Sequence, residues 1–261
     1  MSLYLVRIRP DARALARFAH DQRLPAADPG YLWHLALRQA FSSDAPQPFR
    51  VFEPDQTGAA GQNQSLHILG YSAVSDEVLA DNLARASEPV RSIFPRSGLA
   101  AKRLPDSFSP AGIFGFSARV CPIVQTRSSD GGRSRELDAF LHATLGIPAD
   151  EKIDRADVYL RWLAERLASG GARLIDAGLV RFHLAGVTRR RHASPQSRTG
   201  TADGPPRQLM AGKRKAARRP DAVIDGRLEV IEPDAFMNLL ARGIGRHRAF
   251  GYGLLLLRRT R

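Results

Sequence analysis

The sequence predicts an α+β fold built from two tandem ferredoxin-like (RRM-like) βαββαβ domains. The first observation is that strand-like and helix-like segments of the first half follow one another in the order βαββαβ. The second observation is that the other half gives a similar order with less clarity. Hydrophobic residues make up 43% of the 261 positions, enough to fill a core in each half. We therefore expect an N-terminal domain at residues 1–126 and a C-terminal domain at residues 127–261.

The first half opens with a strand and a well-marked helix. Residues 3–10 alternate and are rich in branched side chains, which is typical of a strand with one buried face. Residues 28–41 predict a helix, because Asp28 suits the N-cap and Pro29 suits the first helical position. The other elements follow the same two patterns, with strands expected at residues 48–54, 65–74 and 111–124 and a Ser-capped helix from Ser75.

The clearest element of the second half is a helix at residues 154–171. Tyr159, Trp162, Leu163 and Leu167 form an apolar stripe at helical spacing, and two glycines end it. The remaining elements are weaker, with strands expected within residues 135–143 and at 177–191, 222–233 and 250–259, and a short helix capped by Asp234.

Arginine supplies nearly all of the formal net charge of +13. Such a surplus points to a polyanionic partner, and nucleic acid is the leading candidate. Lysine occurs only at Lys102, Lys152, Lys213 and Lys215. The arginine guanidinium donates paired hydrogen bonds to phosphates and guanine edges and stacks on bases. A bias towards arginine codons is the alternative, but it explains local clusters less well.

Several functional classes are disfavoured by residues that the chain lacks. The single Cys121 excludes an intrachain disulfide and a cysteine-rich zinc site, so we expect a reducing compartment, the cytoplasm. No apolar run approaches the ~20 residues that span a bilayer, so we expect no membrane partner. No His, Cys or carboxylate spacing typical of a metal site occurs, and we expect no metal and no cofactor.

Three polar side chains share one face of the helix at residues 28–41. Tyr31, His34 and Arg38 are three and four positions apart, so a phenol, an imidazole and a guanidinium lie in one stripe. A lone His on a helix is more often structural than catalytic. An imidazole can nevertheless donate or accept a proton near pH 7, and cleavage of RNA needs little more because its 2′-hydroxyl is the internal nucleophile.

A long basic insertion at about residues 189–221 separates two expected strands of the second half. Arg189, Arg190 and Arg191 follow one strand directly, and Lys213, Arg214 and Lys215 lie on the returning arm. The insertion is either a solvated loop or a two-stranded ribbon that grips a nucleic-acid duplex or hairpin.

A glycine-rich segment at residues 243–253 lies between a helix and a strand. Its glycines are Gly243, Gly245, Gly251 and Gly253, and its basic residues are Arg246, His247 and Arg248. Glycines let backbone N–H groups approach a phosphate closely, so the segment is a candidate cradle for a nucleic-acid backbone. A helix C-cap followed by a turn is the alternative. The segment is no nucleotide P-loop, because the GxxxxGK[ST] order is absent.

These motifs together resemble the CasE-type CRISPR RNA endoribonucleases, the repeat-processing subunits of type I-E Cascade complexes. The resemblance covers nearly the whole chain, and the glycine-rich segment is its most specific element. The matching segments are LYLVRIRP, the Y-x-x-H of Tyr31 and His34, FRVFE, the F-x-x-R-x-x-P around Arg119, YLRWLAERL, DGRLEV and GIGRHRAFGYGLLLL.

The resemblance implies a function and a role for each motif. It implies binding of the CRISPR repeat RNA hairpin and metal-free cleavage at the 3′ base of the stem, leaving a 5′-hydroxyl and a 2′,3′-cyclic or 3′-phosphate end. His34 would be the general acid, and Tyr31 would orient or deprotonate the 2′-hydroxyl, although the two could exchange roles. The basic insertion, the glycine-rich segment, Arg38 and Arg119 would bind RNA, and other Cascade subunits would be partners that share the mature crRNA.

The chain departs from the family's pattern at three positions. Cys121 stands where the family usually has Asn, Arg248 where it has Lys, and the apolar Leu35 where some members carry a basic residue. We therefore expect Arg38 or Arg248 to supply the cation for the transition-state phosphate. Two other hypotheses remain, a non-catalytic subunit that holds an RNA hairpin and a basic DNA-binding or ribosome-associated protein.

Overall fold

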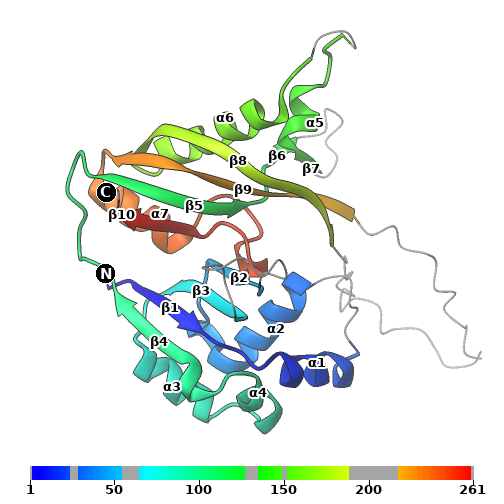
Figure 1. The fold of residues 1–261 in the computed structure, drawn as a ribbon, viewed down its shortest axis with the longest axis vertical. Coiled ribbons are helices and arrows are strands. Elements are labelled where there is room, and N and C mark those ends of the chain that lie inside the picture. The colour runs from blue at the N-terminus through cyan, green and yellow to red at the C-terminus, as the bar shows by residue number, and fades with distance from the viewer. Residues whose placement is uncertain are drawn as a thin grey trace, which may run out of the picture.

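The computed structural model describes residues 2–23, 29–54, 65–126, 135–148, 152–187 and 217–259. Within these ranges two four-stranded antiparallel sheets face each other (Figure 1). The helices within residues 12–93 lie on the far side of the first sheet, and the helix at residues 155–168 lies on the far side of the second (Figure 1). The molecule is thus layered, with these helices outside and the two sheets between them.

The first sheet is formed entirely by residues before position 104. Its strand order is β2-β3-β1-β4, with every neighbouring pair antiparallel. This order and the helices between the strands make a ferredoxin-like βαββαβ unit. The strands are β1 (Tyr4–Ile8), β2 (Phe49–Phe52), β3 (His67–Ser72) and β4 (Leu99–Arg103). The helices are α1 (Ala12–Asp21), α2 (Pro29–Phe41), α3 (Asp76–Ala84) and α4 (Glu88–Ile93), with 3-10 turns at η1 (Ser42–Asp44) and η2 (Arg96–Gly98).

The second sheet repeats that order with later strands. Its order is β10-β5-β9-β8, so β5 takes the place that β1 holds in the first sheet. Its strands are β5 (Ile113–Val120), β8 (Ala172–Val187), β9 (Ala217–Val230) and β10 (Leu255–Arg259), and a separate pair is formed by β6 (Ile123–Thr126) and β7 (Arg135–Asp138). Its helices are α5 (Ala139–Ala143), α6 (Arg155–Ala168) and α7 (Pro233–Arg242), with a 3-10 turn at η3 (Arg248–Phe250). The predicted fold class is confirmed.

The strand that we expected to close the first half lies in the second sheet. β5 pairs with β9 and β10, and the fourth strand of the first sheet is instead β4. The chain therefore changes sheet between Arg103 and Ile113. The physical reason is that alternation in a segment fixes its faces but not its partners, which are chosen by distant residues. The domain boundary expected after residue 126 stays a prediction, and the change of sheet precedes it.

Smaller expectations are also corrected. α1, α4 and α5 were not expected, whereas the strand expected within residues 135–143 is present as β7. Asp234 does not cap its helix: α7 begins at Pro233, and Glu232 is the N-cap. Ser75 does precede α3 as predicted, and Tyr159, Trp162, Leu163 and Leu167 are buried on α6 as predicted.

The two cores use the outer, helix-covered face of each sheet. Val6, Ile8 and Ile68 of the first sheet pack with the helices below, including the buried α2 face of Trp33, Ala36, Leu37 and Ala40. The inner faces of the sheets meet each other: Leu5 and Leu69 pack against the second core, and the Tyr71 hydroxyl donates to the Leu255 carbonyl, 2.8 Å away. Burial of this phenol raises its pKa, so it remains a donor.

The strands that flank the basic insertion pair as a ribbon. β8 and β9 are antiparallel as far as Val187 and Ala217. Because β9 begins at Ala217, the last residues assigned to the insertion belong to a strand. Arg189, Arg190, Arg191, Lys213, Arg214 and Lys215 lie outside the described residues.

Candidate active site

The polar stripe on α2 meets the glycine-rich segment. His34 and Tyr31 are half-buried and Arg38 is exposed, on the side of α2 away from its buried apolar face. The His34 ring lies against Phe250 with centroids 5.2 Å apart, and His34 forms a hydrogen bond with the backbone of Ala249. The structure therefore brings together two motifs more than 200 positions apart, as a composite site requires.

The environment of His34 favours the neutral imidazole in the free protein. Burial is the main cause of its lowered pKa, and the nearby Arg38 guanidinium acts in the same direction. The hydrogen bond with the Ala249 backbone opposes both. A phosphate bound beside this ring would add a negative charge and favour protonation, so RNA itself is expected to change the proton affinity of His34.

The glycines of the segment are required by its own backbone. Gly243, Gly245, Gly251 and Gly253 have φ between 72° and 90°, a region that disfavours other residues. A Cβ on Gly253 would lie 2.5 Å from the Ile244 carbonyl oxygen. The Ile244 amide donates to the Gly253 carbonyl at 2.8 Å. This hydrogen bond joins the two ends of the segment and closes it into a loop.

The loop also uses amides that we expected to be offered to phosphate. The Gly243 amide donates to the Leu239 carbonyl at 2.7 Å, and the Gly253 amide donates to the Arg119 carbonyl at 2.7 Å. The phosphate cradle expected from the glycines therefore does not include these two amides. The turn itself requires these glycines, and the contact of the segment with RNA stays a prediction.

Arg246 and His247 of the loop and Arg219 of β9 converge on one carboxylate that the sequence did not reveal. Glu136 of β7 forms ion pairs with Arg246 at 2.8 Å and with Arg219 at 3.1 Å, and His247 Nε2 lies 3.3 Å from the same carboxylate. His247 has a left-handed backbone with φ of 61°. Burial, then the charge of Arg219, lowers its pKa, while Glu136 opposes this shift. Glu136 thus anchors the loop that contacts His34.

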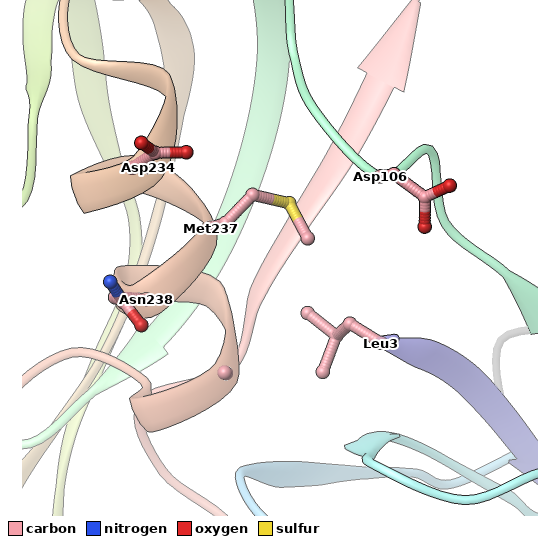
Figure 2. Close-up of a pocket in the computed structure, with 6 residues that line it drawn as sticks. Leu3, Asp106, Asp234, Met237 and Asn238 are labelled. Carbon is pink, nitrogen blue, oxygen red and sulfur yellow. The ribbon is translucent and has the colours of Figure 1, made fainter. Parts of the chain in front are cut away.

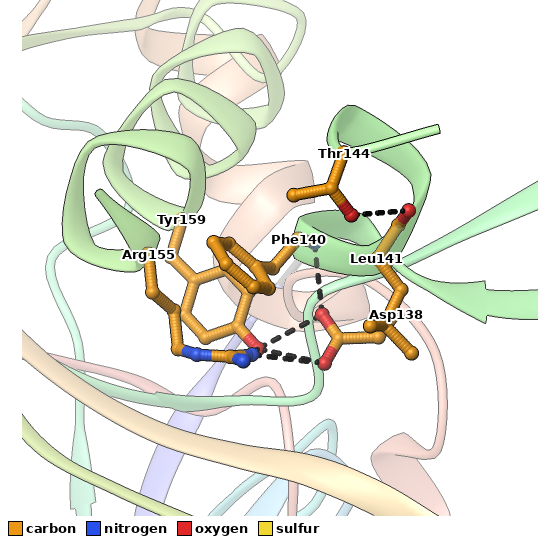
Figure 3. Close-up of polar contacts among 6 residues, drawn as sticks. All are labelled: Asp138, Phe140, Leu141, Thr144, Arg155 and Tyr159. Carbon is orange, nitrogen blue, oxygen red and sulfur yellow. Dashed lines mark hydrogen bonds and ion pairs between the residues drawn. The ribbon is translucent and has the colours of Figure 1, made fainter. Parts of the chain in front are cut away.

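A hydrogen-bond network around Asp138, two residues after Glu136, holds β7 in place (Figure 3). Asp138 accepts from the Tyr159 hydroxyl at 2.9 Å, from Arg155 at 3.1 Å and from the Phe140 amide at 2.9 Å. The Arg155 guanidinium also lies 3.8 Å from the centroid of the Phe140 ring. Since Tyr159 and Arg155 belong to α6, the network holds β7, and with it Glu136, against that helix.

Arg119, which the sequence predicts to bind RNA, is paired with a carboxylate in this structure. It donates to Asp221 through Nε at 2.9 Å and through Nη2 at 2.5 Å, and Asp221 is fully buried. His183 Nε2 lies 3.2 Å from the same carboxylate. Burial alone would lower the pKa of Arg119, but the hydrogen bonds and charge of Asp221 outweigh it and raise that pKa. The guanidinium also lies over the Tyr252 ring, 4.8 Å from its centroid.

Two other predicted residues have defined surroundings. Arg248 Nη1 donates to the Arg242 carbonyl at 2.6 Å, so part of its guanidinium is already engaged within the protein. Cys121 is buried with Ile123 and Tyr252. Burial raises the pKa of its thiol to about 12, so Cys121 packs as an apolar side chain and is no nucleophile.

A cavity of about 200 Å³ lies beside α7 and the N-terminus. Met237 and Leu3 point towards each other across it (Figure 2). It is lined by Leu3, Asp106, Asp234, Met237, Asn238 and Ala241. Two carboxylates and none of the predicted site residues line this cavity, so its chemistry does not suit a nucleic-acid phosphate.

Two further searches concern only the described part of the chain. In it, no group of three or more His, Cys, Asp or Glu side chains could hold a metal ion. Likewise, none of the helices in these ranges has the length and apolar character needed to cross a membrane.

Comparison with known proteins gives one family and a consistent set of folds. A family model described as "CRISPR associated protein" matches residues 3–259. No curated protein matches the chain by sequence. Several solved structures share its fold at low identity, among them the following three. CRISPR endoribonuclease Cse3 bound to 19 nt RNA has a TM-score of 0.63 and 19% identity, covering 99% of this chain and 100% of that chain. The CRISPR-associated protein Cas6e from Escherichia coli str. K-12 has a TM-score of 0.54 and 18% identity, covering 98% of each chain. A chain of a CRISPR RNA-guided surveillance complex, pre-nicking, has a TM-score of 0.52 and 17% identity, covering 97% of this chain and 98% of that chain.

Proposed function

This chain belongs to the CRISPR associated protein family, and from that premise we propose that it is a CRISPR-repeat-specific endoribonuclease. It binds the repeat stem-loop of precursor crRNA and cleaves at the 3′ base of the stem. The fold it shares with a Cse3 endoribonuclease bound to RNA supports this proposal. The observation that carries it is the contact of His34 with Ala249 and Phe250 of the glycine-rich loop.

The proposed reaction needs a base, an acid and a cation. The 2′-hydroxyl loses its proton to the base and attacks the adjacent phosphorus, and the bond to the 5′-oxygen breaks as the acid protonates that oxygen. The products are a 2′,3′-cyclic phosphate, or a 3′-phosphate after hydrolysis, and a 5′-hydroxyl. Tyr31 and His34 supply base and acid, with His34 assigned as the acid. No metal takes part in this proposal.

Arg38 is the better of the two candidate cations for the transition-state phosphate. It is exposed and lies one helical turn from His34. Arg248 is already bonded to the Arg242 carbonyl. A guanidinium beside the phosphate would stabilise the extra negative charge that develops on its oxygens.

The protein is proposed to remain with its product. A chain of similar fold forms part of an RNA-guided surveillance complex, which supports other Cascade subunits and mature crRNA as partners. We infer that it acts in the cytoplasm, where its single thiol stays reduced.

One observation favours a second function. The lowered pKa of His34 leaves the general acid mostly unprotonated in the free protein at neutral pH. A non-catalytic subunit that holds an RNA hairpin has no need of a protonated imidazole, so this function is the alternative.

Cleavage of a labelled repeat hairpin in EDTA separates the two functions. The wild type should cut at the 3′ base of the stem, and His34→Ala should bind the hairpin but cut about 10²–10⁴-fold more slowly. His20→Ala, at the exposed end of α1, is the matched control and should cut normally. Binding without cutting by the wild type, also after Mg²⁺ is added, would support the hairpin-holding subunit. Cutting that appears only with Mg²⁺ would overturn the metal-independent mechanism.

A further inference from the structure

Arg50 reaches from the first sheet to the second. It lies on β2, next to Phe49, which is buried in the first core, so the two side chains leave opposite faces of the strand. Arg50 Nη1 donates to the Ser117 hydroxyl of β5 at 3.1 Å. One guanidinium, from an edge strand, therefore lies between the two sheets.

The charge of Arg50 is poorly balanced. Burial, followed by the charges of Arg119 and Arg181, lowers its pKa to about 10, and two carboxylates only partly oppose this. Those carboxylates already serve other arginines: Asp221 binds Arg119, and Asp225 lies 2.9 Å from Arg258. Arg119 of β5 and Arg181 of β8 are both level with Val223 of β9, so their side chains leave the same face of the second sheet. Among the described residues, neither Arg50 nor Arg181 forms an ion pair. Guanidiniums from β2, β5 and β8 thus leave a net positive charge that an anion would balance.

Two stacked rings adjoin this charge. The Arg50 guanidinium carbon lies 4.6 Å from the centroid of the Phe52 ring. Phe52 and His67 are cross-strand neighbours whose rings are stacked with centroids 5.0 Å apart and planes 7° apart. His67 Nδ1 lies 3.0 Å from the Ser65 carbonyl oxygen, which orients the imidazole. Both rings are only partly buried.

We propose that Arg50, Arg181 and the Phe52–His67 ring pair bind an unpaired nucleotide of the RNA that flanks the hairpin stem. The phosphate group of that nucleotide binds Arg50 and Arg181. Its base stacks on the row of planar groups formed by the Arg50 guanidinium and the Phe52 and His67 rings. An unpaired base is required, because bases within a stem have both faces covered by their neighbours and only a splayed base can stack on side chains. This assignment rests on the proposed function.

The position of the cluster fits a nucleotide beside the cut. The η3 turn, which carries Ala249 and Phe250, contacts both α2 and β2. His34 and Arg50 therefore lie on two elements that flank the same loop. A bond at the base of a stem joins paired to unpaired RNA, so a strand leaving the stem near His34 would pass onto β2.

Two RNA probes test this, both with a 2′-deoxy nucleotide at the cleavage site to prevent cutting. One is the repeat hairpin with its unpaired flanks, and the other is the stem-loop alone. Arg50→Gln, Phe52→Leu and His67→Ala should each weaken binding of the flanked RNA about tenfold while changing the stem-loop affinity less than about twofold. Arg85→Gln, an exposed arginine beyond α3, is the charge-matched control and should bind both RNAs as the wild type does.

The same measurements separate failure of the inference from failure of the proposed function. An equal loss on both probes, or no loss on either, would overturn the unpaired-nucleotide site while leaving hairpin binding intact. If the wild type binds an unstructured RNA strand through Arg50 and Phe52 but not the hairpin, the site stands and the proposed function fails. If it binds neither RNA, both are overturned. His67→Ala protects the test against misfolding, because that ring is only partly buried and its hydrogen bond goes to Ser65 of its own half and not to the second sheet.

Discussion

The arginines of the second sheet and those beside the glycine-rich loop on the first half have opposite surroundings. On the second sheet most are matched to carboxylates, as in the pairs Arg119–Asp221, Arg173–Glu229, Arg227–Asp176 and Arg258–Asp225, and among the described residues Arg181 of β8 is an exception. Within the described residues, Arg38 of α2 and Arg50 of β2 have no carboxylate partner. A high number of arginines therefore does not show which surface can bind an anion. That surface is shown by the arginines whose charge no carboxylate balances.

The largest effect is expected from breaking the best-matched pair. Asp221→Asn leaves the mostly buried Arg119 without a counter-charge, which should reduce the free energy of unfolding by about 3–5 kcal/mol. Urea denaturation at pH 7 measures this. Asp176→Asn, in a solvent-exposed pair, is the control and should leave the unfolding midpoint unchanged. A similar midpoint for both variants would show that burial does not set the value of these pairs.

Glu136→Gln should move cleavage and binding in opposite directions. Loss of the charge frees Arg219 and Arg246 and loosens the loop that contacts His34. We expect single-turnover cleavage to slow about tenfold, a change of about 1.4 kcal/mol in the barrier, while hairpin affinity stays equal or improves.

The control for Glu136 is Glu165→Gln, which removes an exposed carboxylate from α6. A parallel fall in affinity and rate for Glu136→Gln would mean that the loop binds RNA and does not position His34. The pH–rate profile adds a second readout, because a merely destabilised fold would not displace it.

Arg38→Gln should shift the proton affinity of His34. Its charge is the second cause, after burial, of the lowered pKa of His34, so its removal should raise that pKa towards 6.5. An NMR titration of the imidazole protons in the free protein measures the shift. No shift would show that burial alone sets the pKa.

The same lowered pKa predicts how stability depends on pH. The unfolded chain binds a proton at His34 near pH 6.5, whereas the folded chain binds it only at lower pH. Stability from this group is therefore complete above pH 6.5 and decreases as the pH falls from 6.5 towards the folded pKa. Thermal unfolding at pH 7.5 and 5.5 should show this decrease, and Arg38→Gln should lessen it.

The smallest effect is expected from a paired arginine on the surface of the second sheet. Arg227 binds Asp176, so Arg227→Gln should change hairpin affinity less than about twofold. Arg38→Gln measured at the same salt concentration should weaken it more. The reverse order would break the comparison, because it would place RNA on the neutralised surface.

Local pattern predicted the type of most elements but not their partners. The apolar spacing of α2, α3 and α6 is a property of each segment, and all three helices form as predicted. β5 was assigned to the wrong sheet because its alternation is equally compatible with either. β4 was missed because Leu99–Arg103 holds two alanines and two charged residues, a weak strand signal that only its pairing with β1 overrides.

The site was predicted where it depends on one helix and missed where it depends on several elements. Tyr31, His34 and Arg38 share a helical face, which spacing reveals. Glu136 is important because it pairs with Arg219 and Arg246, which are more than 80 positions away. The sequence around Glu136 has no pattern that predicts these ion pairs. The functional roles assigned to Tyr31, His34, Arg38, Arg119, the basic insertion and the glycine-rich segment all stay predictions.

One sheet uses only residues before 104 and the other only residues after 112. The two sheets can therefore form only one after the other as the chain leaves the ribosome. The first sheet has all its strands once Arg103 emerges. β5 emerges next, but its neighbour β9 follows only after about 100 further residues. At ~5–20 residues per second, β5 waits on the order of 5–20 s with the apolar side chains of Phe116, Ala118 and Val120 unpaired. The nascent chain is therefore most exposed to aggregation or chaperone capture during synthesis of the long insertion, after its first half is complete.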